Sequence, residues 1–176
     1  MDSEELVVLE NKWLLFDTSV LLRIAKRGDD IESPLVKLRE KYSCIFSVHD
    51  LIVQEFLSYT IRQEAYNARL NLVQQYPSLP VSQKERELAL HVSRIYAINK
   101  ISSPSVVDCI TAAFCKKYSK DVVLLTNDLK DFPTVLFDPI YIWPFDGSSQ
   151  VDLFGFYKFS PGKMEKEEKK LESASK

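Results

Sequence analysis

Short runs of apolar residues alternate along the chain with longer segments in which apolar residues recur at helical spacing. Strands that alternate with helices are typical of β-α-β units and a mainly parallel sheet. The first run, Trp13–Phe16, is continuously hydrophobic, which favours a central strand covered on both faces. The pattern therefore predicts an α/β fold. Its strands are expected at 13–16, 44–48, 121–126 and 140–143, with a short edge piece at 79–81.

The segments between these runs carry helix-start signals. Ser47 with Asp50, and Ser82 with Glu85, have the spacing of a capping box. Ser103 can cap a later helix, with the following proline in the first helical position. Helices are therefore predicted at about 48–59, 62–76, 82–98 and 104–118.

The apolar pattern also suggests how the chain is divided. Residues 1–11 are expected to be an N-terminal extension, and residues 12–145 the folded domain. Residues 146–160 form an aromatic extension that we expect to pack on the domain or on a partner. Residues 161–176 are highly charged with few apolar positions, which predicts a disordered tail.

Composition narrows the class of protein. The chain has 176 residues, 45% of them hydrophobic, which suits one compact domain. Its odd set of three cysteines favours a reducing compartment over a disulfide framework. The acidic N-terminus and the lack of a long apolar stretch predict a cytoplasmic protein without a membrane span. A net charge of −2 provides no global basic footprint for nucleic acid, although bound cations could supply positive potential locally.

Acidic residues recur where a parallel sheet gathers ligands. Asp17 directly follows the first apolar run, and Asp128 follows the run at 121–126. Both should lie at the carboxyl ends of strands, where α/β sheets bind ligands. Glu55 lies about two turns into one predicted helix and Asp108 about one turn into another, so both can point into the same cleft.

Four carboxylates in one cleft repel one another and require a cation. Oxygen ligands without nearby His or Cys favour Mg²⁺ or Mn²⁺ over zinc. Such an ion can activate water and neutralise charge on a phosphate, so the pattern points to phosphodiester hydrolysis. No glycine-rich phosphate loop is present, which argues against a nucleotide cofactor.

Each acid also has a purely structural interpretation. Asp17 and Asp128 could cap a helix or turn, and Glu55 could be an ordinary exposed helix acid. Asp108 is flanked by apolar residues, so burial without a cation or hydrogen-bond partner would be costly. Asp131 is a secondary candidate, closer to a helix-start residue than to a ligand.

Basic residues and histidines are less informative. Arg23, Lys26 and Arg27 could guide phosphate into the cleft, and a solvated helix face would explain them equally well. His49 and His91 have no triad partners and are expected to be structural rather than catalytic.

Four segments, in order, resemble the PIN domain family. The resemblance covers about residues 13–145. Its motifs are Phe16-Asp17-Thr18-Ser19-Val20-Leu21-Leu22, then Glu55, then Ser105-Val106-Val107-Asp108-Cys109-Ile110-Thr111-Ala112-Ala113, and finally Leu125-Thr126-Asn127-Asp128-Leu129-Lys130-Asp131-Phe132.

The resemblance implies a PIN-like three-layer α/β/α sandwich with about four to five strands, and a metal-dependent endoribonuclease acting on single-stranded or structured RNA. It implies Mg²⁺ or Mn²⁺ as cofactor. It also implies a homodimer and, where the protein is the toxin of a toxin-antitoxin pair, an antitoxin protein as partner. The family's acidic positions fall on Asp17, Glu55, Asp108 and Asp128, and its hydroxyl role falls on Ser19 or Thr126.

Two other functions fit part of the pattern. A PIN-like module that binds RNA or acts as a scaffold without cleaving would keep the fold but lose the activity, and the presence of all four acids argues against it. A phosphoryl-transfer domain of the haloacid-dehalogenase type would use Asp17 as nucleophile, but it requires a second Asp where this chain has Ser19.

Overall fold

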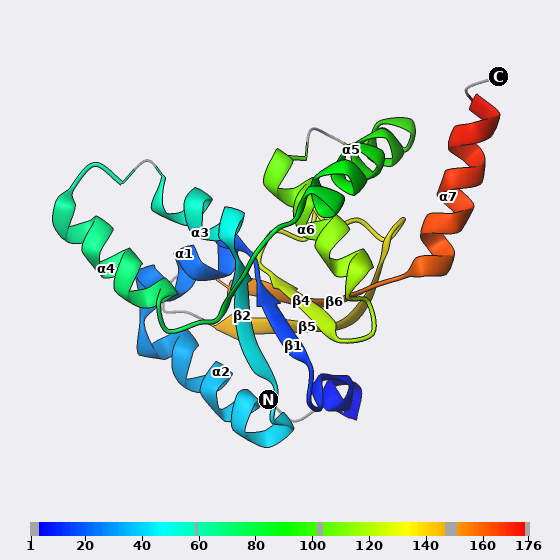
Figure 1. Cartoon of the computed structure of the whole chain (residues 1–176). Helices are drawn as coiled ribbons and strands as arrows, with labels where there is room; N and C mark the ends of the chain where they lie inside the picture. Colours follow the sequence, from blue (N-terminus) through cyan, green and yellow to red (C-terminus); the bar gives the residue numbers. More distant parts are fainter. Residues whose placement is uncertain (1–3, 59, 102–103, 147–150, 175–176) are drawn as a thin grey trace.

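The computed structural model describes residues 4–58, 60–101, 104–146 and 151–174. Its centre is a six-stranded sheet with the order β3-β2-β1-β4-β6-β5 (Figure 1). Strands β3, β2, β1 and β4 are parallel to one another, whereas β6 is antiparallel to both β4 and β5. The α/β class and the mainly parallel sheet are confirmed, with one strand more than expected. The strands are β1 Trp13–Phe16, β2 Ile45–His49, β3 Ser78–Leu79, β4 Val122–Thr126, β5 Phe137–Asp146 and β6 Val151–Phe159.

Helices cover both faces of the sheet. A short 3₁₀ helix, η1 Glu4–Leu9, packs under the side that carries α1 to α4, and α5 to α7 lie on the other side (Figure 1). Among the described residues, no helix has the length and apolar character needed to cross a membrane. The helices are α1 Thr18–Arg27, α2 Asp29–Tyr42, α3 Asp50–Leu57, α4 Gln63–Val73, α5 Gln83–Ile98, α6 Val106–Lys117 and α7 Pro161–Ala174.

Strand β1 shows why the central strands are continuously apolar. Successive side chains of a strand point to opposite faces. Leu14 and Phe16 therefore enter the core on the side of α1 to α4, and Leu15 enters the core beneath α5 and α6. All three are fully buried, so a polar residue at any of these positions would lie in a core.

Two helix starts differ from the sequence prediction. Helix α3 is capped by His49, whose ring Nδ1 accepts a hydrogen bond from Ile52 N, and not by the Ser47–Asp50 pair. Helix α6 is capped by Ser105, while Ser103 lies outside the described residues. The Ser82 capping box at the start of α5 is confirmed.

The end of the folded domain was predicted too early. Strand β5 was expected to stop at Pro144 but continues to Asp146. Because β5 is an edge strand, a proline there can leave its missing N–H on the unpaired side. Strand β6 then lies between β4 and β5, so the segment at 151–159 is part of the sheet and not an extension packed on it.

The prediction of a disordered tail is also wrong. Residues 161–174 form α7, which packs against α5. Met164, Glu167 and Leu171 are buried along one face of this helix. Apart from Glu167, its charged residues are exposed or only partly buried, which is why composition alone suggested a solvated tail.

Candidate active site

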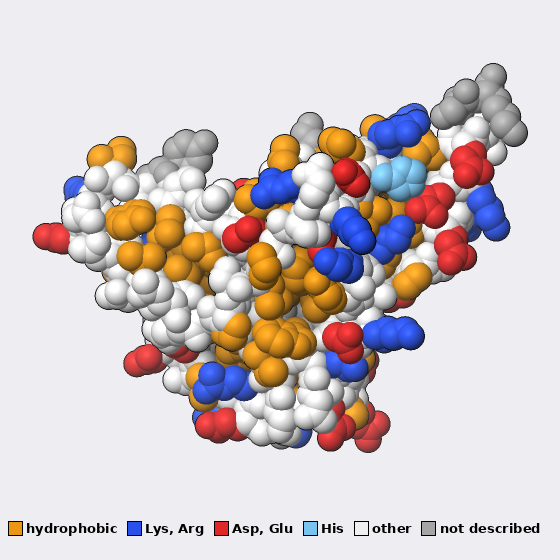
Figure 2. All heavy atoms as spheres, viewed as in Figure 1, with side chains coloured by type: hydrophobic (Ala, Val, Ile, Leu, Met, Phe, Trp, Pro, Cys, Tyr) orange, Lys and Arg blue, Asp and Glu red, His pale blue; other side chains and the backbone are white. Residues whose placement is uncertain are grey.

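All the predicted acids line one cavity at the carboxyl ends of the parallel strands. The cavity has a volume of about 490 Å³ and opens between α3 and α6. Figure 2 shows the outline of the molecule indented between the part that carries α3 and α4 and the part that carries α5 and α6. The lining residues are Asp17, Thr18, Ser19, Leu22, Glu55, Ser58, Arg69, Ser105, Asp108, Asp128 and Asp131.

Asp17 lies where β1 ends and α1 begins. It is the N-cap of α1, so its capping role and its place in the acidic cluster are compatible. Its Oδ2 accepts hydrogen bonds from Ser19 Oγ at 2.6 Å and from Thr126 Oγ1 at 2.9 Å. Burial raises the pKa of Asp17, and the hydroxyl hydrogen bonds oppose this shift only in part.

The same two hydroxyls connect Asp17 to the loop that leaves β4. Ser19 Oγ accepts from Asn127 N at 2.9 Å, and Thr126 Oγ1 accepts from Asp128 N at 2.9 Å. Each hydroxyl thus donates to the carboxylate and accepts from the backbone. The ends of β1 and β4 are held in register by their side chains as well as by strand pairing.

Asp108 lies in the first turn of α6 and forms a capping box with Ser105. Its Oδ2 accepts from Ser105 N at 2.7 Å, and Ser105 Oγ accepts from Asp108 N at 3.1 Å. Burial raises the pKa of Asp108 to about 7, and the negative charges of Asp131 and Asp17 add to the shift. A carboxyl in this position is kept in its charged form only by a compensating positive charge.

Asp128 and Asp131 lie on the loop after β4. Burial, together with the charges of Asp128 and Asp17, raises the pKa of Asp131 to about 6. Asp128 Oδ1 accepts from Lys130 N at 3.2 Å, so this acid also stabilises the local turn. Asp131 was a secondary candidate in the sequence, but its charge interacts with those of Asp17, Asp108 and Asp128.

Glu55 enters the cavity from α3. It is partly buried, and one of its carboxylate oxygens accepts a hydrogen bond from Thr18 Oγ1. This contact links α3 to the first residue of α1. The structure therefore brings Glu55 to the wall of the same cavity, although the helix position alone had suggested an ordinary exposed acid.

The donor set suits a hard divalent cation. The cavity offers carboxylate and hydroxyl oxygens, with no histidine or cysteine in its lining. Burial, with a further contribution from neighbouring carboxylates, raises the pKa values of Asp108 and Asp131, and a bound cation would favour their charged forms. Among the described residues, however, no three such side chains are grouped closely enough to hold a metal ion.

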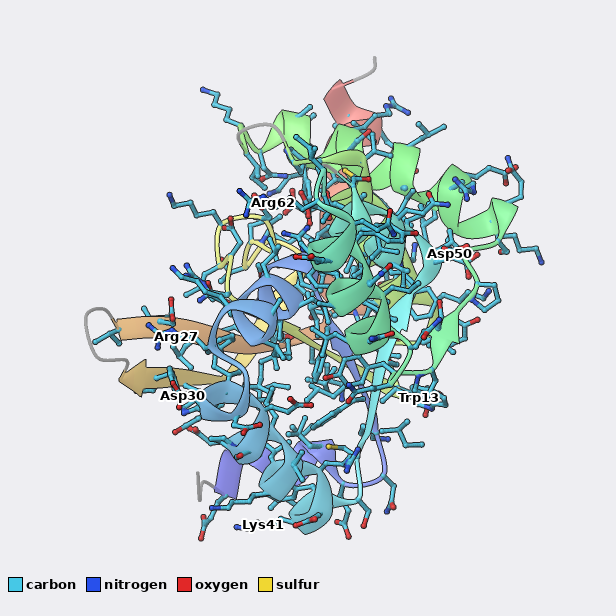
Figure 3. The ribbon with its side chains drawn as sticks, turned by 90° about the vertical axis from the view of Figure 1, so that its left-hand side faces the viewer. Trp13, Arg27, Asp30, Lys41, Asp50 and Arg62 are labelled. Carbon is cyan, nitrogen blue, oxygen red and sulfur yellow. The ribbon has the colours of Figure 1, made fainter. Side chains whose placement is uncertain are left out.

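Two of the predicted phosphate-guiding residues have internal partners. Arg23 Nε and Arg27 Nη2 each lie 3.4 Å from a carboxylate oxygen of Asp152, which is buried on β6. Arg23 Nε also donates to Asn127 Oδ1 at 2.9 Å, so Arg23 connects Asp152 to the loop after β4. Figure 3 shows Arg27 beside the β5–β6 strands. Lys26, by contrast, is exposed.

Arg69 was missed by the sequence analysis. It lies on α4, where its Nη1 donates to Phe56 O at 2.7 Å and to Thr60 Oγ1 at 2.8 Å. Its guanidinium lies 5.1 Å from the centre of the Phe56 ring. No local motif marks this arginine, because its importance depends on α4 folding back beside the cavity.

The histidines are structural, as expected. His49 is fully buried and its Nε2 lies 2.8 Å from Thr111 Oγ1. Burial lowers the pKa of His49 to about 4, so it is neutral near pH 7. His91 lies 3.3 Å from Glu168 of α7, away from the acidic cavity.

Comparison with known proteins agrees with the family resemblance seen in the sequence. A family model described as PIN domain matches residues 14–135. A solved toxin-antitoxin complex from Klebsiella pneumoniae contains a chain 16% identical, with a TM-score of 0.53, over 69% of this chain and 91% of that one. The structure of VapBC2 from Rickettsia felis, bound to a DNA fragment from its promoter, contains a chain that is 14% identical, with a TM-score of 0.57. The match covers 68% of this chain and 90% of that one. No curated protein matches the chain.

Proposed function

The chain belongs to the PIN domain family, and from this premise we propose that it is a metal-dependent endoribonuclease that hydrolyses phosphodiester bonds in single-stranded or structured RNA. One observation carries the proposal. Five carboxylates from four separate segments line a single cavity, and burial and mutual repulsion raise the pKa values of Asp108 and Asp131 to about 7 and 6. Strongly shifted acids gathered in one cleft are characteristic of a functional site.

Asp17, Glu55, Asp108 and Asp128 would hold Mg²⁺ or Mn²⁺, with Asp131 adding charge beside them. The bound cation would supply Lewis-acid activation of water and neutralise the phosphate. The protein's own contribution is orientation. Ser19 and Thr126 donate to Asp17 and thereby direct its remaining lone pairs toward the cavity. Water would form the new bond to phosphorus while the bond to a ribose oxygen breaks.

The test is cleavage of a single-stranded RNA with Mn²⁺ or Mg²⁺ by three variants. We expect Asp17→Asn and Asp108→Asn to lose cleavage by at least about 100-fold, because each removes a charge that a metal site requires. Asp30→Asn, on the exposed start of α2 and outside the cavity, is the matched control and should cleave like the wild type (Figure 3).

Unchanged folding of the variants is checked by circular dichroism. Cleavage that persists in both cavity variants would exclude the assigned site. RNA binding without any cleavage in Mn²⁺ would instead favour a non-catalytic RNA-binding or scaffold module, which the lack of a closely grouped ligand set among the described residues leaves open as the second candidate.

We also propose that the protein acts as the toxin of a toxin-antitoxin pair, with an antitoxin protein as partner, as a homodimer and in the cytoplasm. Support for the toxin role and the antitoxin partner comes from the structural neighbour described as a toxin-antitoxin complex. The homodimer rests on the family resemblance, and the location on the acidic N-terminus and the lack of a long apolar stretch. Co-expression with the product of an adjacent small reading frame tests the partner. Co-purification with loss of ribonuclease activity supports this role, and growth unaffected by the protein alone contradicts it.

A further inference from the structure

A second, larger cavity adjoins the acidic one. It has a volume of about 1170 Å³ and shares Ser19, Leu22, Arg69 and Asp128 with the acidic cavity. Its walls come from α1, α4, the loop after β4 and β6. We call it the flanking groove, defined by Leu22, Lys26, Ala68, Leu72, Lys130 and Leu153. Because the two cavities share a wall, a ligand chain that crosses the acidic site can continue into the groove.

The charge of the groove is opposite to that of the acidic cavity. Its lining contains Arg23, Lys26, Arg69 and Lys130 against two acids, Glu32 and Asp128. Arg23 is partly neutralised by Asp152, at 3.4 Å. Lys26 is exposed, and so provides an accessible positive charge in the groove.

The rest of the groove surface is aliphatic. Leu22 and Leu153 are 42% and 43% exposed, which is high for leucine, and both line the groove. Ala65, Ala68 and Leu72 form the face of α4 opposite them. No aromatic side chain is among the described lining residues. The groove therefore offers the bases no stacking platform, and a strand would be held there through its phosphates by the cations.

We propose that the flanking groove is the subsite for the single-stranded RNA nucleotides next to the scissile phosphate, with Arg69 as the positioning residue at the junction of the two cavities. The inference rests on the proposed function, whose substrate path it defines. Continuity with the acidic cavity and complementary charge identify the occupant as a polyanionic strand. The groove binds it through phosphate contacts and tolerates any base sequence.

Arg69 has hydrogen-bond donors left for a phosphate. Both of its hydrogen bonds within the described residues, to Phe56 O and Thr60 Oγ1, are made by Nη1. A guanidinium has five N–H donors, so Nε and Nη2 keep donors for a phosphate. Arg69 donates a hydrogen bond to the carbonyl of Phe56, the residue that follows Glu55. This contact couples phosphate binding in the groove to the acid on α3.

The first experiment measures binding separately from cleavage. The dissociation constant of the full-length protein for a fluorescent 12-nucleotide polyuridylate is measured in EDTA over a range of KCl concentrations. Arg69→Gln and Lys26→Gln should each reduce the slope of log Kd against log salt by about 0.7, the value for one phosphate contact on a single strand. Ala68→Glu should weaken binding about tenfold at low salt, by placing a negative charge in the groove.

Ala97→Glu is the matched control, because Ala97 is an exposed helical alanine on α5 outside both cavities. It should bind as the wild type does. With Mn²⁺ present, Arg69→Gln should raise KM for the 12-mer more than it lowers kcat, which a residue needed only for folding would not do.

Several results would overturn the inference. Salt slopes that are unchanged in Arg69→Gln and Lys26→Gln, together with unchanged affinity in Ala68→Glu, would exclude phosphate contacts in the groove. A wild-type dimer that Ala68→Glu converts to a monomer in light scattering, with RNA binding unchanged, would assign this face to a second copy of the chain. Failure of the proposed function is distinct: wild-type protein would bind RNA with these slopes but not cleave it.

Discussion

At the residue scale, the acidic site depends on side chains that serve structure and chemistry together. Asp17 caps α1 and Asp108 completes the capping box of Ser105 at the start of α6, yet both line the cavity. A helix N-terminus stabilises a carboxylate through its backbone N–H groups. This compensation is incomplete for Asp108, because burial still raises its pKa to about 7.

A first prediction concerns Asp108 and pH in the absence of metal. Its pKa is near 4 when unfolded and about 7 when folded, so the folded state binds the additional proton between these values. Stability should therefore fall as pH rises from about 4 to 7 and stay low above it. The penalty has an upper limit of roughly 4 kcal/mol, since one pKa unit corresponds to about 1.4 kcal/mol.

Asp108→Asn removes this titration while keeping an oxygen that can accept from Ser105 N. Urea unfolding in EDTA at pH 5 and pH 8 should show the variant more stable than the wild type at pH 8, with the difference shrinking at pH 5. Equal differences at the two pH values would show that Asp108 is not the group responsible.

Sequence reasoning at this scale succeeded where position along the chain determines position in space. Asp17 and Asp128 follow strands, and parallel strands end at one edge. It failed for Arg23 and Arg27, because their partner Asp152 is more than a hundred residues away on a strand that the pattern did not reveal. No local signal identifies such a pair.

At the element scale, the strands buried on both faces were predictable and the C-terminal elements were not. Strand β4 is apolar up to its last residue, Thr126, and buried at every position. Strand β6 includes Asp152, Gly155 and Lys158, which weaken its apolar pattern. Gly155 is required there: a Cβ would lie 2.2 Å from the ring of Tyr157 and 2.8 Å from Leu129.

Helix α7 provides a second prediction. Met164 is buried against the core formed with α5 and α6. Met164→Ala should destabilise the protein by about 2 to 5 kcal/mol, the usual cost of truncating a buried methionine. Lys166→Ala, at an exposed position of the same helix, should change stability by less than about 0.5 kcal/mol. Both are measured by urea unfolding, and equal, small effects would show that α7 does not pack as described.

At the scale of the whole molecule, the PIN match at 14–135 ends before the sheet does. Strands β5 and β6 and helix α7 follow it, and β6 pairs directly with β4. The resemblance in the sequence identified the family correctly, and the acids that it marks line one cavity. It did not reveal how the later segment completes the sheet, because pairing between distant strands is decided by packing and not by local pattern.

A third prediction links the acidic cavity to the stability of the entire chain. A cation that binds only the folded protein raises its melting temperature. Mn²⁺ at about 100 times its dissociation constant should add roughly 2.7 kcal/mol, or about 5 to 10 °C for a chain of this size. The rise should be larger at pH 8 than at pH 5, because ligands must lose their protons to bind metal.

Differential scanning calorimetry of the wild type and Asp17→Asn makes the comparison, with KCl of equal ionic strength as control. A melting temperature that Mn²⁺ leaves unmoved, or moves equally in both proteins, would contradict a metal site at this cavity.

The place of β6 in the sheet has a consequence for synthesis on the ribosome. Asn127 Nδ2, beside the acidic cavity, donates to Leu153 O, and Arg23 is held by Asp152 of the same strand. The loop that carries Asp128 therefore lacks these supports until residues 151–159 have left the ribosome. A nascent chain that already contains every acid of the cavity would still have an unfinished sheet. Maturation of the site thus waits for residues 151–159, and a chain that stalls or is released before them would have an incompletely supported site.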